Sequence, residues 1–321
     1  MFTNYRYYLV FTEERNISHA AERLFISHQN LSKYLSNLEK KLGVTLFIRK
    51  PVISLTPEGE LLRDTFRKVE TLEQSLLAEY ASMHGDLSGE IRLGTTEGRF
   101  RILMPDLLSS FMHKYPGIHL NIVSAASPEL QDMLLNNQLD LAVFGKPNKT
   151  SPFLRYTEVL SEHLYLVISD NLLKAQFGEA FPACKEQFLN GADLRLFRDV
   201  PFALNLPDFN SSRIIRQHLE RIGTELNCIH VSSHPDLHHM MSARDYAASF
   251  CLTMYLPSLQ KISAESGHSL NVFPILGLSE TNPLVIACLQ NRSFPKHAEA
   301  LIRLISRQCL AFAAYDIPYR N

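Results

Sequence analysis

A short stretch near the N-terminus restricts the fold of this chain more than any other part of it. From Ile17 to Phe47, two helical patterns are separated by a very short interruption, and the second ends at a glycine. In the first pattern, apolar residues at i, i+3, i+4 and i+7 form one helix face, and two of them are alanines, which allow close packing. These residues are Ile17, Ala20, Ala21 and Leu24. The spacing predicts two tightly packed helices.

The second pattern predicts a helix with well-defined ends and an apolar stripe. Ser27 is a good N-cap, and Gly43 is a natural residue to end the helix. The stripe consists of Leu31, Leu35, Leu38 and Leu42. An earlier helix with Tyr5, Tyr8 and Leu9 facing inward would complete a three-helix cluster.

The first turn and the outer face of this second helix are polar. Their side chains donate and accept hydrogen bonds but offer little to a core, and an α-helix fits the major groove of DNA. The pattern therefore predicts a helix-turn-helix whose polar face reads bases. The predicted base-reading residues are Ser27, His28, Gln29, Asn30, Ser32, Lys33 and Ser36. The alternative is a simply solvated face, since helical hairpins are common.

Two short strand-like runs follow, with Arg49 and Lys50 at the tip between them. Their shape and charge predict a wing that contacts phosphates. Thr56 is expected to cap the next helix, with Pro57 at its first position. Residues 1–58 carry eight Lys or Arg and five acidic residues, so this end has a charge of +3 and the remainder −4. This asymmetry agrees with a polyanion partner, double-stranded DNA, at one end.

The N-terminal residues resemble those of the LysR-type transcriptional regulators over about sixty positions, and the resemblance continues more loosely to about residue 305. The matching residues are Ser18, Ala20-Ala21, Leu24, Ser27, Ser32, Leu38-Glu39, Leu42-Gly43, Leu46-Phe47-Ile48-Arg49 and Leu55-Thr56-Pro57-Glu58-Gly59. Two departures affect the expected base preference, because His28-Gln29 replaces the family's Gln-Pro pair and Lys33 replaces its Arg. The resemblance implies a transcriptional regulator rather than an enzyme, without a cofactor and commonly tetrameric.

Residues 57–84 read as one long helix that would span about 42 Å at 1.5 Å per residue. Its apolar stripe consists of Leu62, Phe66, Val69, Leu76, Tyr80 and Met83. A lone helix of this length needs a partner, and paired subunits usually read DNA half-sites, so we expect a dimer seam. The resemblance implies the same role, whereas the alternative is packing against the helix's own chain. Residues 85–89 look like a hinge.

From Glu90 onward, strands alternate with helices, which predicts βαβ units and a parallel sheet. Strands are expected at 91–93, 118–122, 139–144, 164–168, 201–204, 226–231, 270–275 and 284–289, and helices at 102–114, from 127, 211–222 and 295–313. The predicted organisation is a winged helix-turn-helix at 1–58, a linker at 59–89, one α/β lobe at 90–162 and 269–321, and a second at 163–268. The resemblance implies that these lobes are similar to periplasmic binding proteins and hold an effector.

A cleft between two such lobes favours anions where strands end and helices begin, because free N–H groups and the helix dipole face it. We therefore expect a small-molecule effector, with a small organic anion as one candidate. The candidate residues are Thr95, Thr96, Arg99, Ser124, Ser127, Phe144 and Asn205. Alternatively, Ser127 is an N-cap and Arg99 a solvated arginine. Phe250 and Leu252 replace small residues usual in the family, which predicts a narrowed or remodelled pocket.

Other classes of function find little support in the residues. No apolar run approaches the roughly 20 residues of a membrane helix, and the N-terminus lacks a signal-peptide pattern, so we expect a cytoplasmic protein. His234 and His238 could share a helix face as metal ligands, but no glutamate lies between them as a zinc protease would need, so no metal is expected. The rival interpretation is a small-molecule binding protein or enzyme whose N-terminal helices serve only oligomer assembly.

Overall fold

The computed structural model describes residues 4–48, 53–83 and 89–314. These residues form two compact units, divided between residues 86 and 87, with the short segment 291–295 grouped with the first unit. Each unit is described separately. Among the described residues, no helix is both long enough and apolar enough to cross a lipid bilayer.

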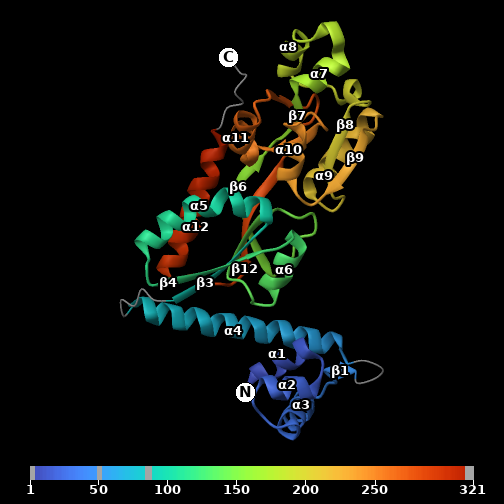
Figure 1. Cartoon of the computed structure of the whole chain (residues 1–321). Coiled ribbons are helices and arrows are strands. Elements are labelled where there is room, and N and C mark those ends of the chain that lie inside the picture. The colour runs from blue at the N-terminus through green and yellow to red at the C-terminus, as the bar shows by residue number, and fades with distance from the viewer. Residues whose placement is uncertain (1–3, 49–52, 84–88, 315–321) are drawn as a thin grey trace. The chain divides into compact units, whose positions relative to one another are not determined.

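The first unit is a three-helix cluster followed by a two-stranded wing and a long helix (Figure 1). Its elements are α1 (Tyr5–Glu14), α2 (Ile17–Arg23), α3 (His28–Leu42), β1 (Phe47–Ile48), β2 (Ser54–Leu55) and α4 (Pro57–Met83). As predicted, the Ser27 hydroxyl caps α3 by accepting the Asn30 N–H at 3.2 Å. Gly43 ends α3 with a φ of 70°, a conformation that glycine adopts without strain. The predicted inward residues of all three helices pack together in one core.

Helix α4 starts where the sequence predicts, since the Thr56 hydroxyl accepts the Gly59 N–H at 3.0 Å. The first half of its apolar stripe packs within its own chain, because Leu62 and Phe66 are buried in the three-helix core. Further along α4, large apolar side chains stay exposed. They include Leu72, Leu76, Leu77 and Tyr80. Arg49, Lys50 and the side chain of Met83 lie outside the described residues. So do residues 85–88 of the hinge expected at 85–89, whereas Gly89 begins the strand Gly89–Thr95.

The second unit begins with a five-stranded mixed sheet in the order β4-β3-β5-β12-β6. Its strands are β3 (Gly89–Thr95), β4 (Ile118–Ser124), β5 (Leu141–Gly145), β6 (Leu154–Glu162) and β12 (Asn282–Leu289). Strands β4, β3 and β5 are parallel, but β12 runs antiparallel to both β5 and β6. The parallel sheet predicted from the βαβ pattern is confirmed for β4, β3 and β5, whereas β12 adds an antiparallel strand and β6 was not predicted.

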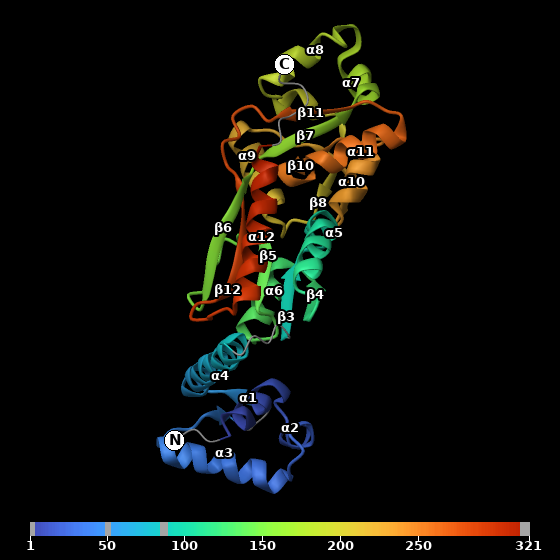
Figure 2. The same ribbon diagram turned by 90° about the vertical axis from the view of Figure 1, so that its left-hand side faces the viewer.

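Three helices cover this sheet. They are α5 (Glu97–Lys114), α6 (Ser127–Leu135) and α12 (Lys296–Ala313). Helix α6 packs over β3, β5 and β12, while α5 and α12 contact each other on the opposite side (Figure 2). The sheet and α6 enclose an apolar core that includes Leu130, Leu134 and Phe144.

The second lobe contains a three-stranded antiparallel sheet, β10-β7-β11, and a parallel pair, β8-β9. The strands are β7 (Leu164–Ser169), β8 (Pro201–Asn205), β9 (Asn227–Ser232), β10 (Ser249–Leu252) and β11 (Leu270–Pro274). The helices are α7 (Asp170–Phe177), α8 (Cys184–Leu189), α9 (Asn210–Ile222), α10 (Pro235–Ser242) and α11 (Leu256–Ser266). The chain was expected to return to the first sheet at 270–275, but this segment forms β11 and pairs with β7. The return that was also expected at 284–289 is confirmed, because this segment lies in β12, which pairs with β5 and β6.

Candidate functional site

The polar face of α3 is open to solvent. Its apolar stripe is buried in the core of the first unit, through Leu31, Leu35 and Leu38. The predicted base-reading side chains lie outside that core: Ser27, His28, Gln29, Asn30 and Lys33 are exposed, and Ser32 and Ser36 are half-buried. A helix with one face packed and the other free can enter a DNA groove without disturbing its own fold.

The basic side chains around α3 differ in how they are used. Arg23 at the end of α2 forms ion pairs with Glu13 and Glu14 of α1, at 2.8 and 2.9 Å. Its charge therefore joins two helices of the unit. Lys33 on the polar face and Lys40 in the last turn of α3 are both exposed, which leaves them accessible to a polyanion.

In the second unit, Arg99 and Glu162 form a buried ion pair. Arg99 lies in the first turn of α5 and Glu162 ends β6; their side chains are only 8% and 0% exposed. Burial by itself would lower the pKa of Arg99, but the adjacent Glu162 carboxylate holds this pKa above its ordinary value. Arg99 is therefore not the solvated arginine of the alternative interpretation.

A chain of hydrogen bonds extends from this ion pair into the second lobe. The Asn282 amide, at the start of β12, donates to Glu162 at 3.0 Å. The side-chain amide of Asn210, at the start of α9, donates to Asn282 Oδ1 at 2.5 Å. These contacts link strand ends of the first lobe to a helix start of the second lobe.

Several buried polar atoms near this chain have no hydrogen-bond partner among the described residues. They are Thr95 Oγ1, Arg99 Nε, Glu162 Oε1 and Asn205 Oδ1. Buried polar groups in folded proteins are nearly always paired, so such atoms mark a place where a ligand or water can bond. Thr95, Arg99 and Asn205 were predicted from the sequence.

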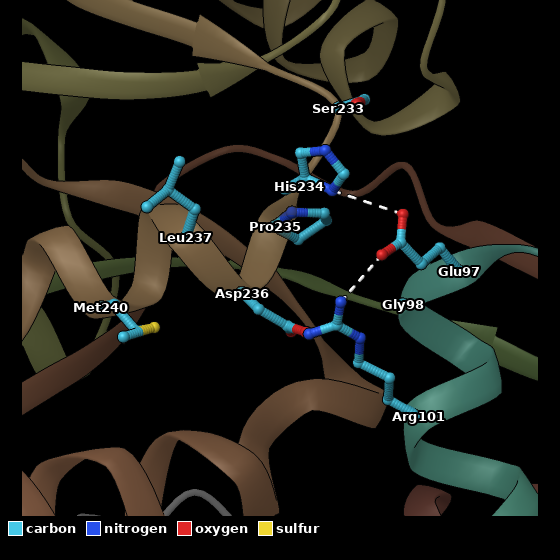
Figure 3. Close-up of a pocket in the computed structure, with 9 residues that line it drawn as sticks. All are labelled: Glu97, Gly98, Arg101, Ser233, His234, Pro235, Asp236, Leu237 and Met240. Carbon is cyan, nitrogen blue, oxygen red and sulfur yellow. Dashed lines mark hydrogen bonds and ion pairs between the residues drawn. The ribbon is translucent and has the colours of Figure 1, made fainter.

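A pocket of about 250 Å³ opens between the starts of α5 and α10 (Figure 3). Its lining residues are Glu97, Gly98, Arg101, Ser233, His234, Pro235, Asp236, Leu237 and Met240. Arg101 contacts Glu97 at 2.8 Å and Asp236 at 3.4 Å, and His234 contacts Glu97 at 3.3 Å. Burial raises the pKa of Asp236. The pocket is therefore lined by both lobes and by groups of both charges.

The structure does not bring all of the predicted effector residues to this region. Phe144 is fully buried in the core beneath α6, so it cannot reach the cleft. Ser127 is the first residue of α6 and is half-buried, whereas Ala126 holds the N-cap position that Ser127 was expected to take. Ser124 is exposed at the end of β4, and Thr96 is half-buried at the N-cap of α5.

Phe250 and Leu252, expected to narrow the pocket, pack on the core of the second lobe and do not line the pocket. His234 and His238 do not converge on one site, because His234 contacts Glu97 and His238 bonds to the Ser232 hydroxyl at 2.8 Å. Among the described residues, no group of three side chains is arranged to hold a metal ion.

Sequence reasoning missed Glu162, Asn210 and Asn282. Glu162 ends a strand that was not predicted, and its partner Arg99 lies 63 residues away in the chain. The only local signal was the polar start of α9, where Asn210 precedes two serines.

Two family models match this chain, one within the first unit and one over most of the second. The family model described as "Bacterial regulatory helix-turn-helix protein, lysR family" matches residues 2–60, and the "LysR substrate binding domain" model matches residues 84–310. Together, fold and matches define a DNA-binding regulator with an effector domain. The chain belongs to the LysR family of transcriptional regulators.

Two relatives and a solved structure illustrate this similarity. The uncharacterized HTH-type transcriptional regulator YkuM of Bacillus subtilis (strain 168) is 30% identical over 162 residues, which span 50% of this chain and 54% of YkuM. YcgK of the same organism, also an uncharacterized HTH-type regulator, is 24% identical over 92% of this chain and 90% of its own. Full-length OxyR C199D from Pseudomonas aeruginosa shares the fold, with a TM-score of 0.63, 20% identity and coverage of 95% and 92%.

The protein is therefore a DNA-binding transcriptional regulator with an effector domain, and its family is not one of enzymes. The rival interpretation, in which the N-terminal helices serve only assembly, is wrong.

Proposed function

We propose that this regulator reads its operator with the exposed face of α3, presented twice by a symmetric pair of subunits. The observation that carries the proposal is the division of α3 into a buried apolar stripe and an exposed polar face. In helix-turn-helix proteins the second helix lies in the major groove, and its N-terminal residues contact base edges. Here those residues are His28, Gln29 and Asn30.

The experiment that tests this proposal separates base contacts from phosphate contacts. Lys33→Ala should reduce the preference for operator over scrambled duplex, because a base-reading group is lost. Arg49→Ala should weaken binding to every duplex alike and should lower the salt dependence, because a phosphate contact is lost. If the wild-type protein shows no preference over random duplex at moderate salt, or if both variants bind as it does, these residue roles are wrong.

We propose that α4 is the dimer seam and that the assembled regulator is a cytoplasmic homodimer or homotetramer. The exposed Leu72 and Leu76 support the seam, because apolar side chains four residues apart lie on one face of a helix, and such a stripe needs a partner helix. Leu76→Glu should lower the mass measured by analytical ultracentrifugation to that of a smaller assembly. Leu310→Glu is the control, since Leu310 is an exposed leucine on α12, 60% exposed against 48% for Leu76. An unchanged mass for Leu76→Glu would contradict the seam.

We propose that the effector binds between the lobes, beside the first turn of α5. The unpaired donors there are the Thr95 hydroxyl and Arg99 Nε, and the unpaired acceptors are oxygens of Glu162 and Asn205. Donors together with acceptors suit a small organic anion that also carries a hydroxyl or amino group. A ligand that prefers one arrangement of the lobes would shift that equilibrium and so change how the paired α3 helices meet the operator.

A thermal-shift screen tests this ligand class. Small hydroxy acids and amino acids should raise the melting temperature by mass action, more than matched acids that lack the donor group. Asn205→Ala should reduce the shift, whereas Ser110→Ala, in an exposed residue near the end of α5, should not. Equal shifts for acids with and without the donor would contradict the proposed ligand class.

A further inference from the structure

Phe25 is the most exposed large apolar residue in the described part of the chain. It lies in the turn between α2 and α3, and 96% of its surface faces solvent. Its neighbours Leu24 and Ile26 are half-buried and pack against the three-helix core. The turn therefore anchors its flanking side chains and projects the phenyl ring outward, where it contributes nothing to the core.

The backbone of Phe25 is also unfavourable for this residue type. Its φ is 55°, in the left-handed region that bulky L-residues rarely adopt. The Phe25 N–H donates to the Glu22 carbonyl and the Ile26 N–H donates to the Ala21 carbonyl, each at 3.0 Å. This is the Schellman motif that ends a helix, and its left-handed position is usually glycine. Folding alone would thus favour glycine or asparagine here, both for the backbone and for hydration of the side chain.

The position of Phe25 suggests what the ring contacts. It precedes the N-cap of α3, Ser27, by two residues and the exposed His28 by three. Because the N-terminal end of a recognition helix meets the base edges, the turn just before it lies at the same groove. The apolar group that the major groove offers is the C5-methyl of thymine, which phenylalanine can contact.

We propose that Phe25 is a DNA-contacting residue that packs on a thymine methyl group at the edge of the half-site read by α3. This inference rests on the proposed placement of α3 in the major groove. On this proposal, the left-handed Phe25 makes the free protein less stable than a glycine variant would be. The ring is kept because it contacts DNA, and it is covered only in the complex.

The experiment uses the full-length protein and an operator duplex that it has selected from a random library. Phe25→Gly should raise the melting temperature of the free protein, because glycine relieves the backbone, and should weaken operator binding about tenfold. Phe25→Asn, which also tolerates this conformation, should weaken binding similarly. Phe25→Leu should retain part of the affinity, because it keeps an apolar side chain.

A chemical change in the DNA then tests the thymine contact. Deoxyuridine at the contacted position, which removes only the methyl group, should weaken the wild-type protein about fourfold and leave Phe25→Gly unchanged. The proposal is overturned if Phe25→Gly binds the operator as the wild type does, or if no deoxyuridine position discriminates between them. A loss of self-association in Phe25→Gly with unchanged affinity for DNA would assign the ring to a second subunit instead. If the proposed function itself were wrong, the wild-type protein would select no operator from the random library, so the two failures can be distinguished.

Discussion

Removing one partner of the Arg99–Glu162 ion pair should destabilise the effector domain strongly. Glu162→Met keeps a similar side-chain volume but removes the carboxylate, which leaves the Arg99 guanidinium buried without its counter-charge. Breaking a buried pair in this way typically costs about 3–5 kcal/mol. Asn282 also loses an acceptor, so the cost should not fall below this range.

The double variant Arg99→Met/Glu162→Met should be more stable than the single variant. Replacing both charges by apolar side chains of similar volume removes the uncompensated charge, and such replacements are often neutral or stabilising. The control is Arg303→Met, which breaks a surface pair with Glu299 whose side chains are 68% and 52% exposed. Its effect should stay within about 0.5 kcal/mol.

The assay is urea unfolding of the full-length protein followed by far-UV circular dichroism, with the slope checked for constancy between variants. The reasoning is refuted if Glu162→Met loses less than about 1 kcal/mol, a loss typical of ordinary substitutions. It is equally refuted if the double variant is no more stable than Glu162→Met, because the penalty would then not come from the unpaired charge.

Two further predictions concern the same unit. A Cβ at Gly98 would lie 2.1 Å from the Tyr255 hydroxyl, so Gly98→Ala should cost about 1–3 kcal/mol in the same urea assay, and adding Tyr255→Phe should recover part of the loss. Burial lowers the pKa of both His238 and His239 to about 4, so between that pH and 6.5 the unfolded chain binds protons that the folded chain excludes. The contribution of these two histidines to the free energy of unfolding is therefore fully present above about pH 6.5. It should fall toward pH 4, by up to about 1.4 kcal/mol per pH unit for each histidine. His239→Gln should reduce this pH dependence when the free energy of unfolding is measured in urea at several pH values.

The first unit could be predicted closely from the sequence because its determinants are local. The cap at Ser27, the stop at Gly43 and the cap at Thr56 each act within a few residues of themselves. Helical spacing then identifies which side chains meet in the core. The exposed, left-handed Phe25 was not predicted, because nothing in the residue spacing favours that conformation for a phenylalanine.

The second unit was predicted less completely because its determinants are distant in sequence. Strand β12 pairs with β5 and β6, which precede it by more than a hundred residues, and β11 pairs with β7 across a similar separation. Hydrophobic periodicity shows that a segment is a strand but does not identify its neighbour. For the same reason Arg99 could be selected as a charged group at a strand-to-helix turn, while its partner Glu162 could not.

The placement of β12 has a consequence for how the protein is made. Ribosomes deliver the chain from its N-terminus, so β5 and β6 emerge long before the strand that belongs between them. Until residue 289 has left the exit tunnel, each of these two strands presents an unsatisfied inner edge, a state in which nascent chains are prone to associate wrongly. The helix-turn-helix precedes this point by more than two hundred residues, whereas the sheet of the effector domain is completed only when β12 can enter between β5 and β6.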